Sequence, residues 1–280
     1  MSPHVDKSAL RLLLPCLAFT LPLALPGVAS AGGLVTPTET VVPKTTRGPI
    51  RQKLHDWDVI VGSGVMYKPK YEGADEYEFQ AVPFVSLQFF DFLNVDPTGA
   101  GVTAYENGPF HFDFSAHYKS GRDEDDSKAL RGMGDIDWGV GIGGRATMDV
   151  GPVGLFLSVE QIVGGGEGLL ASAGISVQRP VSERVILGAE AGATFADDKY
   201  MESYFGVDRK QSANSGYAEY KPEAGIKSVD AAVSATWLIN EKWLLRGEQK
   251  FSVLTGDAAD SPIVQEEFQS KTMLLLGYRF

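Results

Sequence analysis

The strongest constraint on the fold of this chain is a strict two-residue alternation of apolar and polar side chains. Between residues 110 and 119, Phe110, Phe112 and Phe114 alternate with polar residues. Similar alternation runs through residues 57–68, 77–86, 135–150, 153–163, 168–178, 184–196, 226–238, 243–254 and 267–280. Because successive side chains of a strand point to opposite faces, this pattern predicts an all-β protein with one apolar and one polar sheet face.

The connections between these segments are of two kinds, and their order is informative. Tight turns are expected at Asn107-Gly108, at Gly151-Pro152, and at residues 180–183 and 240–242. Longer polar or flexible loops are expected at residues 119–135, 164–168, 196–225 and 255–267. Turns and loops alternate along the chain, so all the long loops emerge on one side. This arrangement is typical of outer-membrane barrels, which have long extracellular loops and short periplasmic turns.

The region 77–106 decides the number of strands. If "SLQFFDFLNV" contains a separate strand, the total is about twelve, and Pro97-Thr98-Gly99 supplies the turn for the extra hairpin. If residues 87–108 form one irregular connection, the total is about ten. Both numbers are even, as in bacterial single-chain barrels, and twelve is the favoured prediction.

A soluble lipocalin-like barrel would show the same alternation with its apolar face inside. Three features instead favour a membrane barrel whose apolar face points outward to lipid. They are long loops on one side only, aromatic residues at the turn-side strand ends, and a polar face with charges of both signs. The aromatic residues are Trp57, Trp237, Trp243, Tyr278 and Phe280. The candidate lumen charges are Arg145, Glu160, Glu190, Arg246, Glu248 and Lys250. We therefore predict a transmembrane antiparallel β-barrel.

The N-terminal part has a different composition. Lys7 and Arg11 precede an apolar stretch that ends at the small residues 29–31, which predicts a signal peptide over 1–31. A lipidated Cys16 is a weaker alternative, because the apolar stretch continues beyond it. Residues 32–55, rich in Pro, Thr and Gly, are expected to form a flexible periplasmic lead segment before a barrel over 56–280. The formal net charge of −11 argues against nucleic-acid binding.

Several stretches together resemble the MipA/OmpV family of Gram-negative outer-membrane proteins. They are "YKPKYEGADEYEFQAVPFV", "SGRDEDDSKALRGMGDID", "ADDKYMESYFGV", "QSANSGYAEYKPEAGIK", "LTGDAADSPIV" and the terminal "GYRF". The resemblance implies an outer-membrane barrel. In the best-known branch it also implies a scaffold that links a murein lytic transglycosylase to a murein synthase. Other relatives are associated with adhesion or with drug and osmotic responses.

Candidate chemical sites are few. His111, Asp113 and His117 share one strand face, but the two imidazoles lie about 20 Å apart along an extended strand and cannot share one metal ion. The loop acids at 123–126, 197–198, 257 and 260 are a candidate for divalent cations that bridge lipopolysaccharide, although a solvated loop is the simpler interpretation. No G-x-S-x-G elbow is present and no histidine falls in the expected extracellular loops. We therefore expect no enzyme, no cofactor and no metal.

The C-terminal strand ends on apolar residues at alternate positions, with Tyr278 and Phe280 last. This ending resembles the signal that the barrel-assembly machinery recognises. The expected surroundings are outer-membrane lipid and lipopolysaccharide. The sequence thus predicts an outer-membrane scaffold or interaction protein. The alternatives are a narrow channel for small solutes, whose selectivity the lumen charges would set, and a surface barrel for adhesion or stress response.

Overall fold

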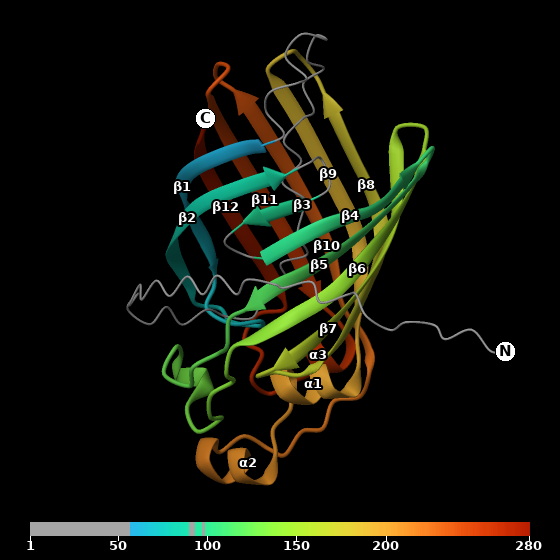
Figure 1. The fold of residues 1–280 in the computed structure, drawn as a ribbon. Coiled ribbons are helices and arrows are strands. Elements are labelled where there is room, and N and C mark those ends of the chain that lie inside the picture. Colours follow the sequence, from blue (N-terminus) through green and yellow to red (C-terminus); the bar gives the residue numbers. More distant parts are fainter. Residues whose placement is uncertain (1–56, 90–92, 97–98) are drawn as a thin grey trace, which may run out of the picture.

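The computed structural model describes residues 57–89, 93–96 and 99–280, which form a closed antiparallel β-barrel of twelve strands (Figure 1). The predicted signal peptide and lead segment lie outside these residues. The strands are β1 (Trp57–Pro69), β2 (Tyr77–Phe89), β3 (Leu93–Asp96), β4 (Gly99–Asn107), β5 (Phe110–Lys119), β6 (Gly139–Val150), β7 (Val153–Gly164), β8 (Gly168–Pro180), β9 (Val185–Ala196), β10 (Gly225–Leu238), β11 (Trp243–Leu254) and β12 (Phe268–Arg279).

Each strand pairs with its sequence neighbours, and β1 pairs with β12 to close the barrel. Closure matters in lipid because an unpaired edge would leave backbone groups without hydrogen-bond partners. The prediction of twelve strands is confirmed. The extra strand β3 is only four residues long, since the first part of "SLQFFDFLNV" continues β2 as far as Phe89. Pro97 and Thr98 of the predicted turn lie outside the described residues.

The outer wall of the barrel is apolar, as the alternation predicts. On β5, Phe110, Phe112 and Phe114 point outward and are exposed. Further exposed apolar residues on other strands include Val61, Val65, Val85, Ile142, Leu155, Leu157, Val159, Ile175, Leu187, Val229, Val233, Leu274 and Leu276. A band of this size around a closed barrel is the surface that faces hydrocarbon.

Aromatic side chains lie at both ends of the strands. On the turn side, Tyr278 makes edge contacts with Trp243 and Phe280. On the loop side, Tyr67 stacks on Tyr77, Phe251 stacks on Phe268, and Tyr118 stacks on Trp138. Two such girdles are expected where a barrel meets the two membrane interfaces, and the sequence reasoning identified only the turn-side one. The side chain of Trp57 is not among those described.

One strand boundary was wrong. The alternation predicted a strand over residues 135–150, but β6 begins at Gly139. Residues 135–138 belong to the preceding loop, where Ile136 pairs only with Arg122 in an isolated bridge. The period-two pattern continues past the end of the sheet because this loop runs extended before it enters the barrel.

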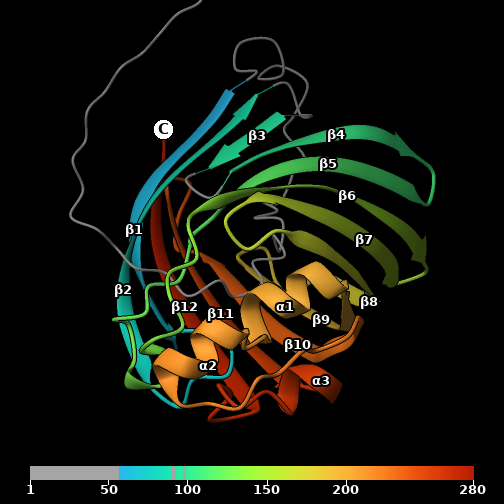
Figure 2. The same cartoon turned by 90° about the horizontal axis from the view of Figure 1, so that it is seen from below.

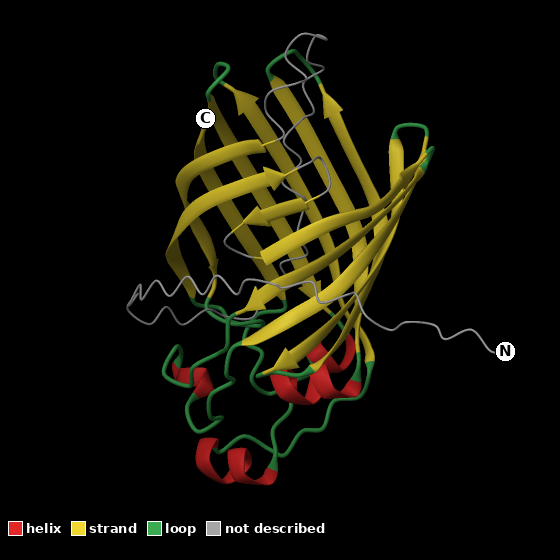
Figure 3. Ribbon diagram, in the orientation of Figure 1, coloured by secondary structure: helices red, strands yellow, loops and turns green. Residues whose placement is uncertain are grey.

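The long loops are folded, which corrects the expectation that they are flexible. They contain α1 (Asp198–Phe205), α2 (Arg209–Ser215), the short α3 (Gly256–Ala259) and a 3₁₀ turn (Lys128–Leu130). All the helices gather at one end of the barrel, opposite the tight turns (Figure 3). Seen from that end, α1 and α2 lie over the mouth on the side of β7 to β12 (Figure 2). No helix in the described part of the chain is long and apolar enough to cross a membrane.

Candidate functional site

The loops form a cap with its own hydrophobic core. Tyr200, Met201, Tyr204 and Phe205 of α1 are buried against the loop-side ends of β7, β8 and β9 and against α3. A second cluster joins Met133, Val207 and Ile263 from three different loops, and a third joins Tyr71 to Leu130. Full burial of one large apolar side chain contributes about 1.5 to 3 kcal/mol, so these clusters fix the loops to one another and to the barrel.

Polar contacts tie the loops together as well. The Tyr71 hydroxyl donates to the carbonyl of Ile263 at 2.9 Å, and Ser261 donates to the carbonyl of Phe205 at 2.6 Å. Arg122 donates to the carbonyl of Tyr204 at 2.9 Å. Burial lowers the pKa of the Arg122 guanidinium and raises the pKa of the Tyr71, Tyr200 and Tyr204 hydroxyls. The cap therefore holds these phenols in the neutral form.

A β-bulge at Lys227 connects the cap to the barrel wall. Ile226 pairs with Phe195 and Ser228 pairs with Thr194, so Lys227 is an extra residue in β10. A bulge of this kind redirects a side chain, and Lys227 is fully buried beneath the cap. Without the bulge, Lys227 and Ser228 could not both face the lumen.

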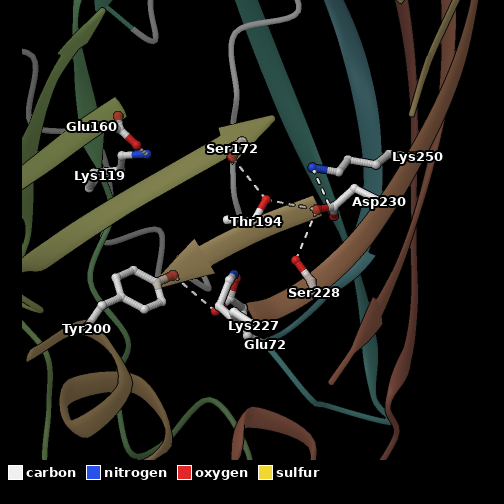
Figure 4. Close-up of polar contacts among 10 residues, drawn as sticks. All are labelled: Glu72, Lys119, Glu160, Ser172, Thr194, Tyr200, Lys227, Ser228, Asp230 and Lys250. Carbon is white, nitrogen blue, oxygen red and sulfur yellow. Dashed lines mark hydrogen bonds and ion pairs between the residues drawn. The ribbon is translucent and has the colours of Figure 1, made fainter. Parts of the chain in front are cut away.

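Lys227 and Tyr200 meet on one carboxylate from the β1–β2 loop (Figure 4). The Lys227 ammonium lies 2.7 Å from Oε1 of Glu72, and the Tyr200 hydroxyl donates to Oε2 at 3.1 Å. The Lys227 ammonium also lies 5.2 Å from the centre of the Tyr200 ring. A buried charge is tolerated only when it is paired and hydrogen-bonded, so this triad locks α1 to β10 and to the β1–β2 loop.

A second polar network lies on the lumen wall beside the triad (Figure 4). Asp230 Oδ2 accepts from the Thr194 and Ser228 hydroxyls, both at 3.0 Å. Thr194 is 3.0 Å from the Ser172 hydroxyl, and the Lys250 ammonium is 3.5 Å from Oδ1 of Asp230. The network contains hydroxyls and a carboxylate but no histidine, so it offers no base of the Ser-His-Asp kind.

The structure places all six sequence-predicted lumen charges on the inward face. Arg145 pairs with Glu190 at 2.8 Å, and Arg246 pairs with Glu248 at 2.9 Å. Glu160 pairs with Lys119 at 2.7 Å, and Lys250 faces Asp230. The sequence reasoning missed Lys119, Asp230 and the Glu72–Lys227–Tyr200 triad. A broken alternation at residues 226–228 was the signal that could have revealed Lys227.

The loop acids stabilise local backbone structure. Glu124 Oε2 accepts from the backbone N–H groups of Gly132 and Gly134 at 3.1 and 2.9 Å. Asp197 caps α1, and Asp257 accepts from the N–H of Glu223 at 2.8 Å. Within the described residues, no group of three or more His, Cys, Asp or Glu side chains is arranged to hold a metal ion. His111 instead contacts Asp149 at 3.0 Å near the turn end.

The glycine-rich loop at 164–168 has a packing role. Gly166 has a φ of +65°, and a Cβ there would lie 2.6 Å from the Tyr204 hydroxyl. A side chain at this position would push α1 off the barrel rim. The sequence predicted only a flexible loop here, whereas in the structure the missing side chain of Gly166 leaves the space that the Tyr204 ring occupies.

Comparison with known proteins identifies the family. A family model described as "MltA-interacting protein MipA" matches residues 61–280. The chain belongs to the MipA family. Two curated relatives, the MltA-interacting proteins of Escherichia coli strain K12 and of Shigella flexneri, are each 28% identical over 89 residues. These alignments cover 32% of this chain and 36% of each relative, so the chain matches about a third of their length.

Solved barrels are only distantly similar to this MipA-family chain. Pseudomonas putida OprB is 13% identical with a TM-score of 0.36, covering 67% of this chain and 49% of that one. The channel DcaP of Acinetobacter baumannii is 9% identical with a TM-score of 0.38, covering 80% and 96%. The fold assignment therefore rests on the strand pairing itself. With the family, the closed barrel identifies an outer-membrane protein.

Proposed function

We propose that this MipA-family barrel is a non-enzymatic interaction protein that holds murein enzymes at the periplasmic face of the outer membrane. The observation that carries the proposal is the folded cap. A buried core and the Glu72–Lys227 pair hold the loops over one end of the lumen, which is unlike the open mouth of a general pore. The curated relatives are named for interaction with MltA, which supports a murein lytic transglycosylase as the first partner.

The partner contact belongs on the side of the tight turns, away from the cap. This side carries the short turns at residues 151–152, 181–184 and 239–242, and the lead segment 32–55 is expected to enter from it. Exposed aromatic residues gather there, including Trp237, Trp243 and Phe280. Aromatic side chains of this group that lie beyond the membrane interface would be available to contact a partner protein.

Pull-down from cross-linked envelopes tests this proposal. Deletion of residues 33–54 is expected to reduce recovery of the lytic transglycosylase and the murein synthase, while heat-modifiable migration shows that the barrel is still folded. Glu72→Gln, which alters only the cap, is the matched control and should leave recovery unchanged. Unchanged recovery after the deletion would count against the lead segment as the contact surface. Failure of the intact chain to recover either enzyme would contradict the scaffold role.

The second candidate is a narrow channel for small solutes. The observation in its favour is that the lumen is charged and not completely filled, since the side chains of Arg145 and Glu190 remain 22% and 20% exposed inside the barrel. A channel would require the cap to open, because α1 is packed on the barrel rim. Planar-bilayer recordings separate the two candidates, with steady current supporting a channel and silence supporting a scaffold.

A further inference from the structure

Three lysines form a row on the inner wall of the barrel. Lys250 of β11 and Lys271 of β12 are directly opposite each other in the strand register. The printed pairing of β1 with β12 runs as far as Tyr67 and Thr272, so the next residues along the two strands are Lys68 and Lys271. Neighbouring strands lie about 4.8 Å apart, so the three Cα atoms span about 10 Å. Like charges in directly opposed positions destabilise a sheet, so the row needs compensation.

Among the residues that the structure describes, the compensation is incomplete. The other lumen ion pairs are short, at 2.7 Å for Lys119–Glu160, 2.8 Å for Arg145–Glu190 and 2.9 Å for Arg246–Glu248. The two outer lysines of the row hold their carboxylates more loosely, at 3.3 Å for Lys68–Glu78 and 3.5 Å for Lys250–Asp230. Lys271, the central one, makes no hydrogen bond or ion pair with any residue that the structure describes.

The available acids are also partly occupied. Asp230 accepts two hydroxyl hydrogen bonds, which hold its Oδ2 away from Lys250. Glu248, on the same inward face as Lys250, is engaged by Arg246. Among the described residues, Glu78 and Asp230 are the acids within ion-pair distance of the three lysines. Asp126 and Glu248 attract Lys68 and Lys271 only from farther away, so Lys271 has no acid in direct contact. Charged groups enclosed by a barrel wall are screened less than exposed ones, so the row attracts an anion.

We propose that Lys68, Lys250 and Lys271 bind a phosphate group inside the barrel. Lysine is a flexible point charge that suits a tetrahedral anion, and three of its stems can converge from adjacent strands on one group. The partial exposure of the Arg145 and Glu190 side chains shows that the lumen has room for small polar molecules beside them. The phosphate belongs either to a free soluble molecule or to a lipid headgroup. This site is independent of the partner contact on the turn side.

Titration calorimetry on the full mature chain refolded in detergent tests the site, with inorganic phosphate added at constant ionic strength. The wild type is expected to bind with one class of site. Lys271→Gln is expected to weaken binding by about tenfold or more, the loss of one charge-assisted contact. Lys119→Gln is the matched control, because Lys119 is an inward lysine with a close acid partner. It should bind phosphate nearly as well as the wild type.

Thermal unfolding gives an independent readout that does not depend on binding enthalpy. In chloride, Lys271→Gln is expected to melt above the wild type, because it removes repulsion within the row. Phosphate should raise the wild-type midpoint and raise that of the variant much less, because the variant binds more weakly. The same melts in phosphatidylcholine liposomes, with and without phosphatidylglycerol, distinguish the sources. Stabilisation by phosphate alone assigns a soluble ligand, and stabilisation by phosphatidylglycerol that Lys271→Gln abolishes assigns a lipid headgroup.

Two results would overturn the proposal. One is a wild type that responds neither to phosphate nor to phosphatidylglycerol. The other is a loss of binding in Lys119→Gln as large as in Lys271→Gln, which would indicate general electrostatic attraction without a built site.

Discussion

The pair between Glu72 and Lys227 is the contact whose loss should loosen the cap most. The two side chains are 11% and 1% exposed. Glu72→Gln keeps an acceptor for the Tyr200 hydroxyl but leaves the Lys227 ammonium without its counter-charge. Removing one partner of a buried pair costs about 3 to 5 kcal/mol, and we take about 3 here because the glutamine oxygen still accepts a hydrogen bond. Cap opening should then become roughly 10²-fold more frequent.

Hydrogen exchange measures this opening directly. The amides of α1 are protected only while the cap is closed, so their exchange rate should rise by roughly 10²-fold in Glu72→Gln, while barrel strands keep their protection. Glu76→Gln is the control in the same loop. Its pair with Lys70 is solvated, with side chains 46% and 30% exposed, so little change is expected. Similar exchange rates of the α1 amides in the two variants would show that the Glu72–Lys227 pair does not hold the cap closed.

Alkaline pH, a substitution at Gly166 and a substitution at Phe280 each perturb a different part of the cap or the barrel end. Because burial raises the pKa of Tyr71, Tyr200 and Tyr204 above their unfolded value, their contribution to stability is complete below about pH 10 and is lost as pH rises. Tyrosinate absorbance, to which all ten tyrosines contribute, should therefore show a late step that coincides with α1 exchange, and absence of this late step would contradict the burial argument. Gly166→Ala should cost about 1 to 3 kcal/mol of cap stability, because a positive φ and contact with Tyr204 both oppose a side chain, and unchanged α1 protection would refute this. Phe280→Ala should lower the yield of heat-modifiable barrel in the outer membrane, and normal yield would remove the assembly role of the aromatic end.

The barrel was predictable because one physical rule governs most of its length. Each strand puts one residue in two against lipid, so the alternation of Phe110, Phe112 and Phe114 fixes both strand and face. The same rule failed at residues 135–138, where an extended loop has the same period outside the sheet. Strand β3 was also hard to define, since four residues leave too short a pattern to separate from β2.

The folded cap could not be predicted from the sequence for a different reason. Its loops are polar on average, and the apolar residues that become buried in it are scattered over four segments far apart in the sequence. Local signals did exist: Asp208 and Gln211 form a capping box at the start of α2, and Asp197 caps α1. The core itself could not be predicted, because Tyr71, Leu130 and Ile263 become neighbours only after the barrel brings their strands together.

In the lumen, the direction of the side chains could be predicted but their partners could not. The inward direction of the six predicted charges follows from strand parity, but their pairing depends on register and on the bulge at Lys227. The acid partners Asp230 and Glu72 could therefore not be assigned from the sequence. The lysine row could not be predicted either. A single lysine such as Lys271 on a polar face is ordinary, and its lysine neighbours are known only from the pairing of the strands.

Single-channel recording of the chain from residue 32 onward in a planar bilayer tests the central claim most directly, namely that the cap makes this an interaction barrel and not an open pore. We expect no steady conductance from the wild type and measurable current from Glu72→Gln, whose cap opens more often. Steady conductance from the wild type, equal to that of Glu72→Gln, would contradict a closed cap.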